Sequence, residues 1–95
     1  MGDATSVPPL FQEYELGNLH LKHRVVLAPL TRCRATAAHV PTDLMVEYYA
    51  QRASTPGTLL ISEATVIVGK AGGLMRAPGI WSDEQIAGWK RVSDP

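Results

Sequence analysis

Two short runs of apolar residues, separated by a helix-like segment, constrain the fold of this chain more than any other feature. The first run, residues 25–28 (VVLA), is followed by Pro29, which has no N–H to donate to a strand ladder. The second run is residues 59–62 (LLIS). Unbroken apolar runs of this length are typical of strands buried on both faces, as in a parallel sheet. With a helix between them, they predict a βαβ unit and therefore an α/β fold.

The segment between the two runs has the start and the periodicity of an amphipathic helix. Thr42 is a suitable N-cap residue, and Asp43 places a negative charge at the positive end of the helix dipole. Pro56 and Gly57 end the helical region. The spacing of four side chains puts them on one helix face, which is expected to point inward: Leu44, Met45, Tyr48 and Tyr49.

A small hairpin is predicted before this unit. Residues 11–16 and 19–21 alternate apolar and polar side chains around Gly17-Asn18, a typical hairpin turn. Residues 1–9 are interpreted as a flexible leader.

A second helix is predicted after the second strand. Ser82 and Gln85 have the spacing of a capping box, and the helix then carries Ile86, Trp89 and Val92 as its apolar positions. Residues 69–73, which are rich in glycine, fit neither the Walker nor the dinucleotide-binding pattern, so we expect a flexible loop over the strand ends. The order is then hairpin, strand, helix, strand, loop, helix, or about two βα units behind a leading hairpin.

Composition and charge argue against several classes of protein. Hydrophobic residues make up 45% and charged residues 19% of the chain, which is ordinary globular composition. The formal net charge of +0 leaves no electrostatic footprint for nucleic acid. Cys33 is the only cysteine and the three histidines lack ligand spacing, so we predict no metal site.

The sequence carries no pattern that predicts membrane insertion, secretion or peroxisomal import. No apolar run reaches the roughly 20 residues of a membrane span. The first residues do not have the basic and apolar regions of a secretory signal, and the last residues are not a peroxisomal tail. We therefore expect a cytoplasmic protein with no membrane partner.

Ligands of α/β sheets and barrels bind beyond the carboxyl ends of the strands. Here those positions are residues 29–31 and 63–65, which, apart from the Glu63 carboxyl, offer hydroxyls, small residues and backbone groups rather than acids or bases. Such groups favour binding of a planar cofactor over proton transfer by the protein. Glu63 is expected to hold neighbouring backbone or a buried arginine, and Arg32 and Arg34 to be solvated or structural.

Six short segments between about residues 10 and 93 resemble segments of a known protein family. They are residues 16–19 (LGNL), 22–32 (KHRVVLAPLTR), 48–53 (YYAQRA), 60–65 (LISEAT), 78–81 (PGIW) and 87–90 (AGWK). In this order and spacing they resemble the old yellow enzyme family of NADH:flavin oxidoreductases, and the plant 12-oxophytodienoate reductases most of all.

The resemblance implies a (β/α)8 TIM barrel that holds FMN. It further implies reduction by NADPH and transfer to an activated C=C bond of an enone or oxylipin, as in jasmonate-related fatty acid metabolism. Pro29, Leu30 and Thr31 match the family segment that lines the flavin, and Ala64 matches a small residue whose backbone approaches the ring. The threonine hydroxyl of the family donates to the flavin C4 carbonyl, where a donor stabilises the charge of the reduced ring.

A complete barrel of this type needs about 250 residues. The 95 residues here therefore predict an incomplete FMN-binding TIM-barrel domain over residues 10–95. The family's substrate-binding pair, its tyrosine proton donor and its flavin-phosphate groups match nothing in this chain, so no catalytic residue is assigned. The sequence leaves the substrate and the oligomeric state open.

Two alternatives to a truncated ene-reductase remain open at this point. One is a non-catalytic truncated remnant without flavin binding or activity. The other is a different FMN barrel, of the dihydroorotate dehydrogenase type. Residues 29–32 (PLTR) and 48–52 (YYAQR) argue against that second barrel.

We expect the isolated 95-residue chain to bind FMN weakly or not at all and not to turn over substrate, because most flavin contacts are lacking and two strands leave open edges. Absorption spectra of the purified chain measure this directly. Yellow protein with one flavin per chain would contradict it. A cooperative thermal melt with added FMN would favour a retained site, and a featureless trace would favour a remnant.

Overall fold

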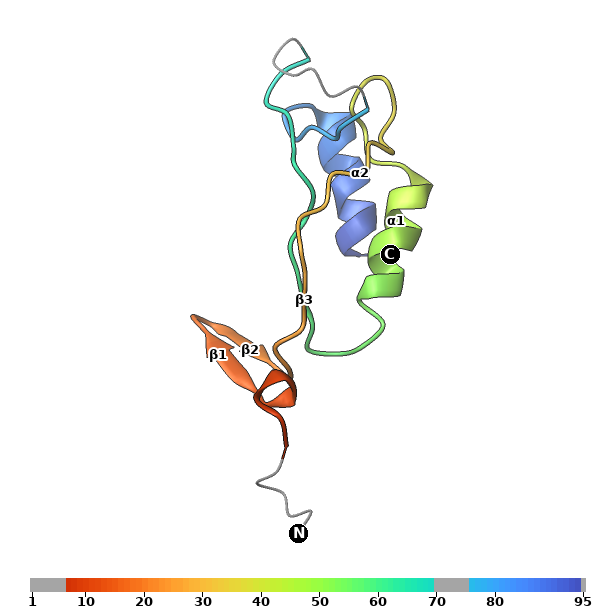
Figure 1. The fold of residues 1–95 in the computed structure, drawn as a ribbon. Coiled ribbons are helices and arrows are strands. Elements are labelled where there is room, and N and C mark those ends of the chain that lie inside the picture. Colours follow the sequence, from red (N-terminus) through yellow and green to blue (C-terminus); the bar gives the residue numbers. More distant parts are fainter. Residues whose placement is uncertain (1–6, 70–75, 95) are drawn as a thin grey trace.

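The computed structural model describes residues 7–69 and 76–94 (Figure 1). Its elements follow in the order 3-10 helix Pro9–Phe11, β1 Tyr14–Leu16, β2 Leu19–Leu21, β3 Val26–Leu27, α1 Asp43–Arg52, β4 Leu59–Leu60 and α2 Asp83–Ser93. The chain is thus a small α/β structure, as predicted. Most of the predicted leader (residues 1–9) and of the glycine-rich loop (residues 69–73) lies outside the described residues.

β1 and β2 form the predicted antiparallel hairpin. Leu16 pairs with Leu19, and the turn between them uses Gly17 at a φ of 59°, in the left-handed region that glycine adopts at no steric cost. The first strand starts at Tyr14 rather than at residue 11, because Pro9–Phe11 forms a 3-10 helix whose Pro9 carbonyl accepts from the Gln12 N–H. Figure 1 shows the hairpin projecting away from the two helices.

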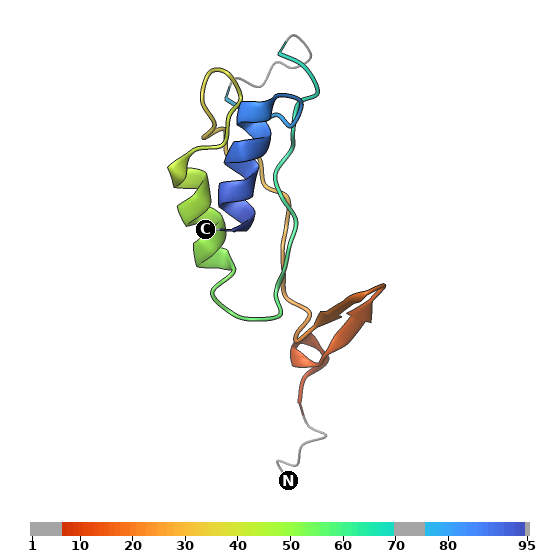
Figure 2. The same cartoon turned by 180° about the vertical axis from the view of Figure 1, so that it is seen from behind.

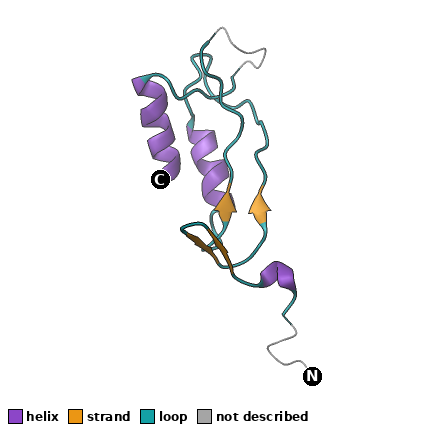
Figure 3. Cartoon of the chain, turned by 90° about the vertical axis from the view of Figure 1, so that its left-hand side faces the viewer, coloured by secondary structure: helices purple, strands orange, loops and turns teal. Residues whose placement is uncertain are grey.

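β3 and β4 are parallel neighbours, which confirms the predicted βαβ arrangement. Val26 pairs with Leu59 and Leu27 with Leu60, and the two arrows point the same way in Figure 3. Both strands are shorter than the apolar runs that predicted them. β3 ends before Pro29, which has no N–H to donate to the ladder, and the Leu30 N–H donates to the Ala28 carbonyl at 2.9 Å instead.

Both helices cover the same face of the β3–β4 pair, as the opposite views in Figures 1 and 2 show. The core between helices and strands centres on three buried residues, Ala35, Met45 and Tyr49. Partly buried side chains complete it: Leu27, Tyr48, Leu60, Trp89 and Val92. No helix in the described part of the chain has the length and hydropathy that a membrane span requires.

Two apolar side chains of the predicted helices lie on exposed faces. Leu44 in α1 is 61% exposed, and Ile86 in α2 is 46% exposed. The inner stripe of α1 follows Met45 and Tyr49, four residues apart, and Leu44 lies about 100° around the helix from Met45. In α2 the buried positions are Gln85 and Gly88, so this helix packs through a polar and a small residue.

The predicted capping box at the start of α2 is confirmed. Ser82 Oγ accepts from the Gln85 N–H at 3.2 Å, and Gln85 Oε1 accepts from the Ser82 N–H at 3.1 Å. The same buried amide also donates to the Ala38 carbonyl at 3.1 Å and accepts from the Trp81 N–H at 2.8 Å. Gln85 therefore caps its own helix and fixes it to the loop before α1.

The expected side-chain cap of α1 does not form. Thr42 occupies the N-cap position, yet its hydroxyl donates to the Arg34 carbonyl at 2.7 Å instead of accepting from the helix. The Thr42 hydroxyl, which the local sequence predicts as the helix cap, thus forms a hydrogen bond to a more distant residue instead.

The β3–β4 pair has an uncovered face. Large apolar side chains stay exposed near it: Val26 (38%), Ile61 (43%) and Leu30 (51%). The described residues therefore form one side of a core rather than a closed one.

Gly88 brings α2 close to the segment before α1. A Cβ built on Gly88 would lie 2.8 Å from Pro41 Cδ, closer than real Cβ contacts. We expect Gly88→Ala to cost about 1–3 kcal/mol by overpacking, more than the roughly 1 kcal/mol that alanine gains in helix propensity. Thermal melting should show a lower Tm.

Gly69→Ala is the matched control, because nothing lies within 4 Å of its built Cβ. An increase in Tm for Gly88→Ala would show that helix propensity outweighs the close approach and would contradict this packing.

Candidate functional site

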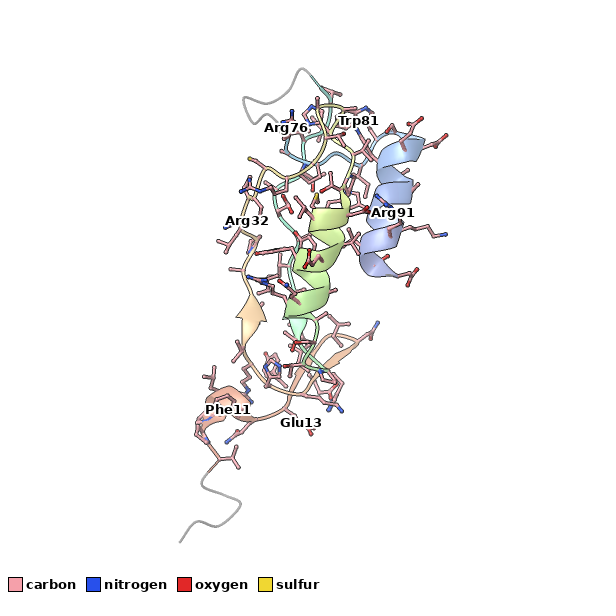
Figure 4. All side chains as sticks on the ribbon, turned by 90° about the vertical axis from the view of Figure 1, so that its right-hand side faces the viewer. Phe11, Glu13, Arg32, Arg76, Trp81 and Arg91 are labelled. Atoms are coloured by element: carbon pink, nitrogen blue, oxygen red, sulfur yellow. The ribbon has the colours of Figure 1, made fainter. Side chains whose placement is uncertain are left out.

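The carboxyl ends of β3 and β4 meet at one edge of the structure. Because the strands are parallel, residues 29–31 after β3 and residues 63–65 after β4 lie at that same edge. Figure 4 shows Arg32 beyond the tip of the β3 arrow, on the side of Trp81, whereas Phe11 lies at the opposite end.

The structure brings the predicted cofactor residues to this edge and leaves them open. Pro29, Leu30, Thr31 and Ala64 are all exposed. Among the described residues, neither the Thr31 hydroxyl and N–H nor the Ala64 N–H has a hydrogen-bond partner. The edge therefore offers free donors beside one proline ring and one small side chain.

A buried hydrogen-bond network lies directly behind this edge. Glu63 is only 3% exposed, and its Oε2 accepts from the Tyr49 hydroxyl at 2.9 Å. The Glu63 N–H donates to the same hydroxyl at 3.0 Å, and Glu63 Oε1 accepts from the Arg32 N–H at 3.4 Å. The expectation that Glu63 holds neighbouring backbone is confirmed.

Tyr49 was not identified as part of the site from sequence, where its spacing indicated packing only. It is both a core residue and a hydrogen-bonding residue, since its ring packs with Met45 and its hydroxyl reaches Glu63. A glutamate at a buried strand end is the one sequence signal for such a partner, because a buried carboxylate needs donors.

The pKa of Tyr49 is raised to about 12. Burial of the hydroxyl is the main cause, and the Glu63 carboxylate adds to it, while the Glu63 N–H acts in the opposite direction. Tyr49 is therefore a neutral donor throughout the physiological range, which suits an oxygen facing a carboxylate.

Arg32 and Arg34 have structural partners. Arg34 Nη1 donates to the Arg32 carbonyl at 2.8 Å, and the Arg32 guanidinium lies 5.9 Å from the centre of the Tyr48 ring. Both line a small hollow of about 170 Å³ next to Glu63. No group of three potential metal-binding side chains occurs within residues 7–69 and 76–94.

Comparison with known proteins identifies the family. Residues 9–95 match the family described as NADH:flavin oxidoreductase / NADH oxidase. The chain belongs to this family. It is 55% identical over 85 residues to the chanoclavine-I aldehyde reductase fgaOx3 of Penicillium roqueforti, covering 90% of this chain and 23% of that protein. It is 51% identical over 86 residues to 12-oxophytodienoate reductase 7 of Oryza sativa subsp. japonica, covering 90% and 21%.

A solved structure shows the same relationship in three dimensions. The old yellow enzyme homologue of Zymomonas mobilis superposes with a TM-score of 0.79 at 52% identity, covering 92% of this chain and 25% of that one. The chain thus spans about a quarter of the length of the relatives it matches. The resemblance to the old yellow enzymes is confirmed, and with it an α/β fragment related to TIM barrels and FMN as the family cofactor.

The donor set at the strand ends fits an isoalloxazine ring. The ring edge of a flavin carries carbonyl oxygens, for which the free Thr31 hydroxyl and the free N–H groups of Thr31 and Ala64 are suitable donors. Pro29 and Ala64 leave room for a flat ring system, because neither has a long side chain. The residues present therefore agree with the cofactor of the family.

Above pH 10, stability should depend on Tyr49. Its pKa is about 12 in the folded chain, whereas the pKa of an unperturbed tyrosine is 10.0, so the unfolded state loses the proton first. The stabilisation is complete below pH 10 and declines as the pH rises from about 10 to 12. We expect denaturant unfolding across this range to show that decline in the unmodified chain.

Tyr49→Phe should lack this part of the pH dependence, whereas Tyr48→Phe, on the same helix, should keep it. Equal profiles for the two variants would show that the pKa of Tyr49 is not raised in the folded chain and would contradict its burial beside Glu63.

Proposed function

We propose that residues 10–95 contribute one wall of an FMN site, in which Pro29, Leu30, Thr31 and Ala64 contact the flavin ring. The observation that carries this proposal is the Thr31 hydroxyl at the exposed carboxyl edge of the parallel pair, which has no hydrogen-bond partner among residues 7–69 and 76–94. In this wall Thr31 donates to a ring carbonyl, Pro29 gives a rigid turn, and Ala64 allows its backbone to come close.

The reaction proposed for the protein is the NADPH-linked reduction of an activated C=C bond. When bound, FMN supplies hydride transfer between the nicotinamide and the substrate. Thr31 assists because a donor at the ring carbonyl stabilises the negative charge that reduction places on the ring. The residues of this chain therefore bind and tune the cofactor, and we assign to none of them a proton transfer to the substrate.

The proposed substrate class is a conjugated carbonyl compound. One relative is named for an aldehyde, chanoclavine-I aldehyde, and another for 12-oxophytodienoate. An enone or oxylipin of the jasmonate type is our specific proposal, and it rests on the resemblance to the plant enzymes. The two names share a carbonyl group, which is the part that both reductases would have to recognise.

A non-catalytic remnant is the second candidate. The uncovered apolar face near Val26 and Ile61 favours it, because a core open on one side gives little stability. Activity of the purified gene product with NADPH and an enone distinguishes the two candidates: turnover supports the reductase, and its absence in a cooperatively folded protein supports the remnant.

Removing the Thr31 hydroxyl tests the flavin wall. In the flavin-loaded gene product, Thr31→Val keeps the shape of the side chain but removes the donor, at a cost of about 1–3 kcal/mol to the reduced ring. The reduction potential should fall by roughly 20–60 mV for the two-electron couple. Spectroelectrochemical titration measures it.

The reduction potential of Thr31→Ser should lie close to that of the unmodified protein, because serine keeps a hydroxyl at this position. Ser62→Ala is the matched control: its hydroxyl follows β4 but lines the hollow between Leu60 and Trp89 on the helix side. A potential that is the same for Thr31→Val and the unmodified protein would remove Thr31 from the flavin site.

A further inference from the structure

The two segments of the proposed flavin wall are joined behind the wall by Glu63, and one helix residue orients its side chain. Tyr49 in α1 donates to Glu63 Oε2 and accepts from the Glu63 N–H, which fixes both the backbone and the side chain of Glu63. The second carboxylate oxygen then accepts from the Arg32 N–H. One hydroxyl thus orients a carboxylate that reaches the other strand end.

These contacts are adjacent to the proposed flavin contacts without being part of them. Thr31 directly precedes Arg32 in the chain, and Ala64 directly follows Glu63. Each of the two flavin-facing residues is therefore one peptide unit away from an atom that the network holds. A small rotation of the Glu63 side chain would move the Arg32 N–H, and with it the Thr31 hydroxyl.

Beyond the strand ladder, a single hydrogen bond joins the two segments in the described part of the chain. The ladder of β3 and β4 ends where the Ile61 N–H donates to the Leu27 carbonyl at 3.1 Å. Within the described residues, the bond from the Arg32 N–H to Glu63 is the only one between residues 28–32 and 62–65. Their relative position beyond the ladder thus depends on Glu63.

The chemistry of the network suits a positioning role. The bond from Arg32 is long, at 3.4 Å, but its acceptor is a buried carboxylate, and hydrogen bonds to charged groups are stronger than neutral ones. The two hydrogen bonds of the Tyr49 hydroxyl are shorter, at 2.9 and 3.0 Å, and the hydroxyl itself is uncharged. They hold the Glu63 carboxylate in one orientation. Only in that orientation can its other oxygen accept the longer hydrogen bond from the Arg32 N–H.

We propose that Tyr49 and Glu63 are positioning residues, which hold the segment at residues 29–31 and the residue Ala64 at the spacing that a flavin ring requires. This inference rests on the proposed function for the identity of the ring. The fixed spacing itself is a property of this chain and can be measured without flavin.

The experiment compares Tyr49→Phe with Tyr48→Phe in the purified gene product, with and without added FMN. Phe keeps the ring of Tyr49 in the core and removes only the hydroxyl. Tyr48 lies on the same helix, and its hydroxyl has no hydrogen-bond partner among the described residues, so its variant is a matched control. Glu63→Gln is the conservative second variant, because it keeps an oxygen acceptor.

Amide hydrogen exchange is the first readout and needs no flavin. In Tyr49→Phe, exchange at the Glu63 and Arg32 N–H groups should rise about tenfold, while the Ile61 N–H in the ladder keeps its protection. In Glu63→Gln the side chain keeps one acceptor oxygen and loses the other, so exchange should rise at the Arg32 N–H but not at the backbone N–H of position 63, which still donates to Tyr49. A uniform rise at all amides would mean a purely structural role and would overturn the inference, as would identical exchange in Tyr49→Phe and Tyr48→Phe.

The flavin potential and affinity are the second readout. Tyr49→Phe should lower the reduction potential in the same direction as loss of the Thr31 hydroxyl and raise the Kd for FMN about tenfold, whereas Tyr48→Phe should change neither. An unchanged potential and Kd in Tyr49→Phe would overturn the inference. If a complete protein that contains these residues binds no FMN at all, the proposed function fails, and the exchange pattern, which is measured without flavin, alone decides whether Tyr49 and Glu63 fix the strand ends.

Discussion

The carboxylate of Glu63 is the constraint on which the strand-end arrangement depends. An ionised carboxylate that is 3% exposed would cost several kcal/mol without hydrogen-bond donors. Here one oxygen receives the Tyr49 hydroxyl and the other receives the Arg32 N–H. These two hydrogen bonds connect three segments: α1 through Tyr49, the end of β4 through Glu63, and the segment after β3 through Arg32. The buried carboxylate therefore favours the arrangement in which all three lie together.

Local sequence signals predicted the local structure well. The Gly17-Asn18 turn, the Ser82–Gln85 capping box and the start of α1 at Asp43 all depend on residues close in the chain, and all are found. The predictions failed where distant residues intervene. The Thr42 hydroxyl binds Arg34, and Leu44 points outward because its neighbours in space cover only the stripe of Met45 and Tyr49.

In the candidate site, too, the sequence predicted what depends on local patterns and missed what depends on long-range contacts. The position of Thr31 and Ala64 at one edge follows from the strand pattern and the parallel rule, so sequence reasoning placed them together. The link behind them did not follow from any local pattern. Tyr49 and Glu63 are 14 residues apart, and only the crossover of α1 over the β3–β4 pair brings the hydroxyl to the carboxylate.

The two faces of the β3–β4 pair differ in what contacts them. On the helix face, Leu27 and Leu60 pack against the Met45 and Tyr49 core, which gives the pair its support. On the other face and at the carboxyl edge, apolar and donor groups stay open, and these are the groups that a planar ring can use. A binding wall needs rigid support on one side and unsatisfied groups on the other. The buried Tyr49–Glu63 contact lies between the two, and it transmits the rigidity of the helix to the open edge.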